Sequence, residues 1–142
     1  PISTDTKVDA EQKQLELLAE NRIDFIVLAR YMQILSGEFV NCYPSRIINI
    51  HHSFLPAFAG AKPYTQAYSK GVKIIGATSH FVTDQLDEGP IIAQDTLKIS
   101  HRDTVSDLVT KGRNVERQVL AEAVRLYIDH RIFVHGRRTI IL

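Results

Sequence analysis

A short polar cluster, Asn49-Ile50-His51-His52-Ser53, contains the residue types best suited to acid–base chemistry. Asn49 and His51 lie two positions apart in a strand-like segment, so both side chains should point to one face of a sheet. A neutral amide donor beside a titratable imidazole can stabilise an oxyanion and move a proton. The same spacing also arises by chance, and the alternative is a capping Asn49 with an interior, hydrogen-bonded His51.

A second polar segment, Asp84-Gln85-Leu86-Asp87-Glu88-Gly89-Pro90, carries three carboxylates between two expected strands. A carboxylate close to His51 would orient the imidazole ring and raise its pKa, and could activate a water molecule. The alternative interpretation is a solvated acidic turn without a catalytic role.

Other kinds of site have less support in the sequence. His51 and His52 are adjacent, which in a strand places them on opposite faces, and no metal-ligand spacing is present, so we expect no metal. Ser53 lacks the Gly-x-Ser-x-Gly context of a nucleophile elbow. Cys42 has no clustered bases and is interpreted as a packing residue, and no Gly-rich phosphate-binding loop occurs.

The elements that would position these residues alternate between helices and strands. The apolar runs Phe25–Ala29 and Arg46–His51 are typical of strands covered on both faces. Thr104 and Asp107 form a capping-box variant that predicts the start of a long helix ending near His130. The full expectation is helices at 9–22, 36–43, 64–69 and 104–130, strands at 25–29, 46–51, 73–82 and 91–99, and a terminal hairpin at 132–142. This is an α/β pattern with some antiparallel pairing in the C-terminal half.

Length, charge and cysteine content indicate a small one-domain protein and give no sign of a nucleic-acid or membrane partner. With 142 residues, 44% of them hydrophobic, the chain fits one domain with a real core. Its 17 Lys and Arg balance 16 Asp and Glu, which gives no argument for nucleic acid or a membrane surface as partner. A single cysteine excludes an internal disulfide and suits a reducing compartment, so we expect a cytoplasmic protein. The chain starts with Pro1 and its one methionine is Met32, so either an initiator methionine was removed or the chain is part of a longer polypeptide.

Two motifs in a fixed order make the sequence resemble the 10-formyltetrahydrofolate-dependent formyltransferase family. They are Asn-Ile-His-His-Ser-Phe-Leu-Pro at 49–56 and Leu-Asp-Glu-Gly-Pro-Ile-Ile at 86–92, with fitting segments at 60–64 and 71–78. The resemblance runs from Ile23 to the C-terminus. It implies a Rossmann-like α/β formyltransferase fold, a mostly parallel sheet flanked by helices that lacks the family's N-terminal strands. Residues 1–142 are thus expected to be the C-terminal part of a catalytic domain, without a second domain.

The resemblance also implies an activity. His52 replaces a proline common in the transferases, and Gly-Ala-Lys-Pro-Tyr follows at 60–64, as in members that pass the formyl group to water. The implied reaction is hydrolysis of 10-formyltetrahydrofolate to tetrahydrofolate and formate, which supplies formate for purine biosynthesis and balances the one-carbon pool. No tightly bound cofactor is expected, and a homo-oligomer is expected. Two alternatives stay open: formyl transfer to glycinamide ribonucleotide, and a folate-binding module without turnover.

The family's catalytic Asn, His and Asp fall on Asn49, His51 and Asp87. The implied mechanism is attack of water on the N10-formyl carbon, with Asn49 and a protonated His51 stabilising the oxyanion. Asp87 would keep His51 charged and relay protons toward the leaving N10.

The folate pocket implied by the resemblance comprises Met32, Ile34, Leu35, Val82, Thr83 and Asp84. Apolar walls with backbone polar groups suit a flat pterin. The alternative is that residues 32, 34 and 35 are simply core. Gln33 stands where the transferases often carry an arginine, which weakens an anionic acceptor site there.

Overall fold

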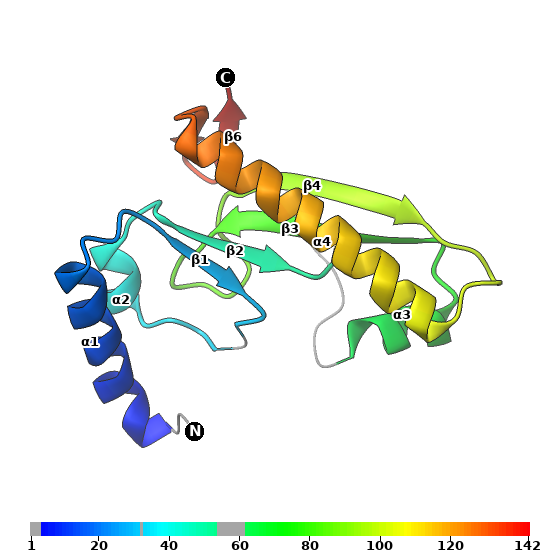
Figure 1. Cartoon of the computed structure of the whole chain (residues 1–142), viewed down its shortest axis with the longest axis horizontal. Helices are drawn as coiled ribbons and strands as arrows, with labels where there is room; N and C mark the ends of the chain where they lie inside the picture. Colours follow the sequence, from blue (N-terminus) through cyan, green and yellow to red (C-terminus); the bar gives the residue numbers. More distant parts are fainter. Residues whose placement is uncertain (1–3, 32, 54–61) are drawn as a thin grey trace.

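The chain forms a four-stranded sheet with helices on both faces, followed by a two-stranded hairpin (Figure 1). A computed structural model describes residues 4–31, 33–53 and 62–142. In chain order the elements are α1 (Thr4–Glu20), β1 (Ile26–Ala29), α2 (Gly37–Cys42), β2 (Ile47–His51), α3 (Pro63–Lys70), β3 (Ile74–Phe81), β4 (Ile91–Lys98), α4 (Val105–Ile128), β5 (Ile132–His135) and β6 (Arg138–Ile141). All the expected elements are present, although α1 begins at Thr4 rather than Asp9.

The large sheet has the strand order β1-β2-β3-β4 and mixed pairing. β1 pairs parallel to β2, whereas β2 with β3 and β3 with β4 are antiparallel. The α/β fold and the antiparallel C-terminal half are confirmed, but the expectation of a mostly parallel sheet is wrong for these four strands. A parallel neighbour needs a crossover that returns the chain to the starting end. The 83–90 loop that joins β3 to β4 is too short for such a crossover, so these two strands pair antiparallel.

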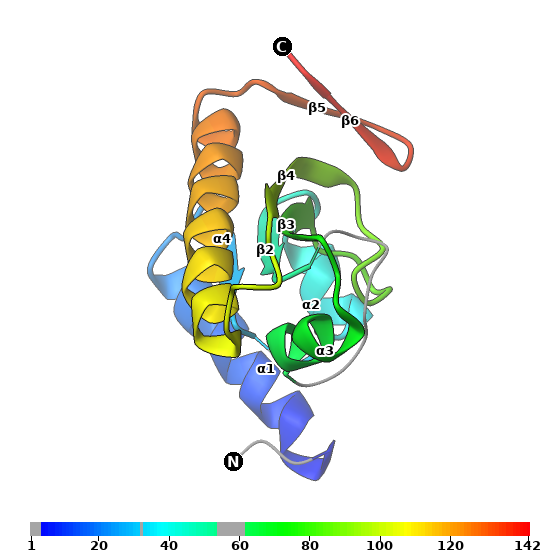
Figure 2. The same ribbon diagram turned by 90° about the vertical axis from the view of Figure 1, so that its right-hand side faces the viewer.

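Alternating residues of β2 separate two hydrophobic cores. Ile48 is completely buried in a core with α4, β3 and β4, while Ile47 is buried in a second core with α2. Figure 2 shows α4 along one face of the sheet and α2 across from it. Because β2 is covered on both faces, its last residues are held rigidly where they leave the sheet.

β1 corrects one expectation from the sequence. Its apolar run predicted a strand covered on both faces, yet Val27 is 40% exposed and the burial alternates along the strand. In the described residues β1 is an edge strand, paired only with β2, and the α4 core includes none of its side chains. The apolar run therefore correctly indicated a strand, and within the described residues this strand is partly covered.

Helix α4 starts as its capping box predicted. The Thr104 hydroxyl accepts from the Asp107 backbone N–H, and the Asp107 carboxylate accepts from the Thr104 N–H. The hairpin β5–β6 turns at Gly136, whose φ of 59° suits the left-handed region. Among the described helices, none is both long and apolar enough to cross a membrane.

Candidate active site

Asn49 and His51 lie at the end of β2 and share one face of the sheet, as the sequence predicted. Both side chains line a cavity of about 380 Å³. The alternation stops where the strand ends: the rings of His51 and His52 stack with centroids 5.0 Å apart, so the expectation that they face opposite sides is wrong. Among the described residues, no three His, Cys, Asp or Glu side chains cluster as metal ligands would.

Asp87 reaches His51 from the loop between β3 and β4. Its Oδ2 lies 3.0 Å from His51 Nδ1, and the two side chains are 23% and 16% exposed. The segment is therefore not a purely solvated acidic turn. It brings together the three residues that the family resemblance implied, Asn49, His51 and Asp87, around one cavity.

Close backbone contacts fix the position of this loop. Phe81 N donates to Pro90 O at 2.9 Å, and Val82 N donates to Ile47 O at 2.9 Å. A Cβ at Gly89 would lie 1.7 Å from Phe81 O, so only glycine fits there. Asp87 itself has a φ of 54°, a conformation that Asp tolerates better than most residues. The carboxylate is thus placed by the backbone.

The electrostatics of His51 differ from the expectation. Burial lowers the pKa of His51 more than the nearby Asp87 carboxylate raises it, so the net direction is downward. A neutral imidazole beside a carboxylate carries its proton on Nδ1, because the carboxylate can only accept. Nε2 then holds a lone pair, and this buried atom has no hydrogen-bond partner among the described residues.

His80 is a further histidine at this site, and reasoning from the sequence did not single it out. The residue is buried, with 2% of its surface exposed. Nε2 lies 3.4 Å from Asn49 Nδ2 and 3.4 Å from Asp87 Oδ1, while Nδ1 lies 2.8 Å from Phe81 O. A histidine within the long apolar 73–82 strand was the available signal. Its significance depends on the β2–β3 register, which pairs Asn49 with His80.

Glu116 adds a second carboxylate to the cavity from helix α4. Tyr64 donates to Glu116 Oε1 at 2.5 Å, and burial together with this carboxylate raises the pKa of Tyr64. The tyrosine fits because α4 has a glycine opposite it: a Cβ at Gly112 would lie 2.0 Å from its hydroxyl. Arg30 is the one Lys or Arg side chain that lines the described cavity.

The residues expected to bind folate divide into three groups. Ile34, Leu35, Val82 and Thr83 line the cavity. Leu35 is 4% exposed and also belongs to the α2 core, whereas Ile34 is 48% exposed. Met32 lies outside the described residues. Asp84 does not line this cavity.

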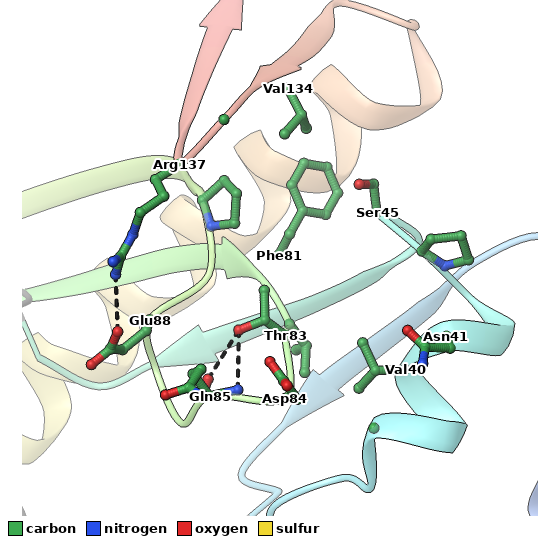
Figure 3. A pocket seen from close by; sticks show the side chains of 15 residues that line it. Val40, Asn41, Ser45, Phe81, Thr83, Asp84, Gln85, Glu88, Val134 and Arg137 are labelled. Atoms are coloured by element: carbon green, nitrogen blue, oxygen red, sulfur yellow. Dashed lines mark hydrogen bonds and ion pairs between the residues drawn. The ribbon is translucent and has the colours of Figure 1, made fainter.

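Asp84 instead lines a neighbouring cavity of about 580 Å³ between α2, the 83–90 loop and the hairpin (Figure 3). Thr83 Oγ1 donates to Gln85 O and accepts from Gln85 N, which stiffens the wall between the two cavities. At the hairpin, Arg137 Nη2 lies 2.9 Å from Glu88 Oε2. The loop that carries Asp87 therefore has a cavity on each side.

Comparison with known proteins finds several relatives. The model of the family described as formyl transferase matches residues 3–124. The chain is 57% identical to a formyltetrahydrofolate deformylase of Synechocystis over 99% of its length and 58% identical to one of Bacillus subtilis over 96%. It covers 49% and 46% of those proteins, so it spans about half the length of these curated relatives.

Solved structures agree with this result. The chain matches a formyltetrahydrofolate deformylase from Burkholderia mallei with a TM-score of 0.93 and 49% identity, covering 100% of this chain and 50% of that one. It matches a glycinamide ribonucleotide transformylase from Symbiobacterium toebii with a TM-score of 0.85 and 41% identity, covering 93% and 62%. The structural similarity thus extends to enzymes named for hydrolysis and for transfer.

Proposed function

The chain belongs to the formyl transferase family, and on that premise we propose that it carries the catalytic site for hydrolysis of 10-formyltetrahydrofolate to tetrahydrofolate and formate. One observation carries the proposal: His51 binds Asp87 through Nδ1, while its buried Nε2 is without a partner among the described residues and lines the same cavity as Asn49. This is the arrangement of a general base beside an oxyanion donor.

The reaction begins with a water molecule between His51 and the formyl carbon. Nε2 of neutral His51 takes one proton from the water as its oxygen bonds to that carbon. Asn49 Nδ2–H and the new imidazolium face the oxyanion, and Asp87 stabilises the positive ring. The proton then passes from Nε2 to N10 and the C–N10 bond breaks, which releases tetrahydrofolate and formic acid, ionised to formate. Because burial lowers the pKa of His51, the ring is neutral before the water attacks and can accept its proton.

The pterin is assigned to the apolar part of the cavity. Ile34 and Leu35 line the cavity together with Val82 and Thr83, a mixture of apolar and polar groups that suits a flat pterin. Met32 is included on the family resemblance alone, whereas Asp84 is left out because it lines the other cavity. Arg30 supplies positive charge to a cavity that must admit an anionic folate.

For the wider protein, the chain is taken as the C-terminal part of a catalytic domain, because it spans about half of its curated relatives. A homo-oligomer in the cytoplasm, supplying formate for purine biosynthesis and using no tightly bound cofactor, completes the proposal. The homo-oligomer, the supply of formate and the lack of a cofactor follow from the family resemblance, and the cytoplasm follows from the single cysteine.

The test is a single sample assayed for both binding and turnover. Titration with a folate analogue measures binding, and formate release from 10-formyltetrahydrofolate measures hydrolysis with and without glycinamide ribonucleotide. Formate release without the ribonucleotide supports the proposal. Tetrahydrofolate that forms only when the ribonucleotide is present, with no formate released, indicates transfer, for which the Symbiobacterium toebii match is the supporting observation. Bound folate without formate indicates a binding module.

A further inference from the structure

His80 is a buried titratable residue that the proposed reaction does not use. It lies on β3 directly opposite Asn49 on β2, so its ring is next to the amide that would bind the oxyanion. Only 2% of His80 is exposed, and its Nδ1 lies 2.8 Å from Phe81 O. The ring therefore has little freedom to turn.

The contacts of His80 determine which ring nitrogen carries the proton. Nδ1 lies 2.8 Å from Phe81 O, and a carbonyl oxygen can only accept, so Nδ1 must donate. In the neutral ring Nε2 is then an acceptor. Its amide neighbour is Asn49 Nδ2, 3.4 Å away, at the long end of hydrogen-bond distances.

We propose that His80 is a positioning residue whose Nε2 lone pair orients the Asn49 side chain so that its NH₂ group, rather than its carbonyl oxygen, serves the reaction. One N–H of Asn49 binds His80, and the second remains for an oxygen in the cavity. An amide without such a partner can rotate by about 180° and present its oxygen, which would repel the developing oxyanion.

Asp87 Oδ1 also lies 3.4 Å from His80 Nε2. If His80 gained a proton there, Nε2 would donate to Asp87 and could no longer accept from Asn49. The groups that face His80 are thus Asn49 from β2, Asp87 from the loop and the Phe81 carbonyl of β3. With the proton on Nδ1, Nε2 of His80 can accept from Asn49, and Asp87 keeps its contact with His51 through its other oxygen, Oδ2.

Two substitutions distinguish the acceptor role of His80 Nε2 from the donor role of His80 Nδ1. In His80→Gln the Oε1 atom can occupy the position of Nε2 and accept from Asn49. In His80→Asn the Nδ2 atom can replace Nδ1 and donate to Phe81 O, but nothing accepts from Asn49. Both variants lose the ring, so their folding defects should be similar, and thermal unfolding checks this.

The role rests on the proposed function for its kinetic readout. We expect His80→Gln to keep kcat within about threefold and His80→Asn to lose about 10- to 100-fold, with little change in KM, because the amide acts mainly on the oxyanion. Equal kcat for the two variants, or a loss confined to KM, would overturn the inference. Formate release by the parent protein tests the proposed function separately from this ranking.

A second readout needs no turnover. ¹⁵N NMR of the imidazole nitrogens should find His80 neutral and protonated at Nδ1. The His80 signal is assigned by its loss in His80→Gln and its presence in the control His101→Gln, which replaces an exposed histidine. A neutral ring protonated at Nε2, or a doubly protonated ring near pH 7, would contradict the proposal even in an inactive sample.

Discussion

The substitution Asp87→Asn isolates the charge of the carboxylate that binds His51. The two side chains have nearly the same shape, and asparagine also tolerates the positive φ of 54° at this position. The loop should therefore keep its conformation. What changes is the negative charge 3.0 Å from His51 Nδ1.

The size of the effect follows from that distance. Two unit charges 3.0 Å apart interact by about 5.5 kcal/mol at an effective dielectric constant of ~20. Exposure of 16% and 23% screens the pair, and the amide oxygen of the variant retains a weaker hydrogen bond. We therefore expect the transition state to lose about 3–4 kcal/mol, a fall of about 10²- to 10³-fold in kcat.

Formate release measures kcat, and titration with a folate analogue measures binding, which should be nearly unchanged. Glu88→Gln is the matched control, because Glu88 is the next acid in the loop and pairs with the exposed Arg137. Asp87→Asn also removes the upward influence on the pKa of His51, so the acidic limb of the rate profile should move to lower pH. Parental turnover in Asp87→Asn would refute the role given to Asp87.

Three further predictions test neighbouring parts of the site. Asn49→Ala should lower kcat by about 10²- to 10³-fold while folate-analogue binding persists, and loss of binding alone would contradict an oxyanion role. Burial lowers the pKa of His51 below the ordinary histidine pKa of about 6.5, so kcat/KM should be constant above about pH 6.5 and decline at lower pH. A midpoint of the pH profile above about 6.5 would contradict this, because it would show that the ring is held in its charged form. Gly89→Ala should lower the thermal unfolding midpoint far more than Gly37→Ala, since the added Cβ lies 1.7 Å from Phe81 O in one case and 3.9 Å from its nearest neighbour in the other; equal midpoints would refute the close contact.

Local periodicity predicted the part of the site that lies on one strand. Asn49 and His51 share a face because side chains alternate along β2, which is a property of the strand itself. The meeting of His51 with Asp87 came only from the family resemblance, since no spacing in the sequence relates a strand to a loop so far along the chain.

The electrostatic state of His51 could not be predicted from its neighbours in sequence. The presence of a carboxylate suggested a raised pKa, but the direction depends on how much water the fold removes from the ring. His80 was missed for a related reason. Its contact with Asn49 exists only in one register of β2 against β3, and a shift by one residue would turn it to the other face.

The strained or sterically restricted backbone positions of the 83–90 loop are best understood through the site. A positive φ at Asp87 and a position at Gly89 that admits no side chain both carry a conformational cost. They allow the loop to close tightly on Phe81, and that closure brings one carboxylate within reach of two histidines on neighbouring strands. A more relaxed turn would connect β3 to β4 equally well, but it would leave the Nδ1 proton of His51 without this acceptor. We therefore infer that the loop has this geometry because it holds the Asp87 carboxylate against the Nδ1 proton of His51, not because β3 and β4 need it to be joined.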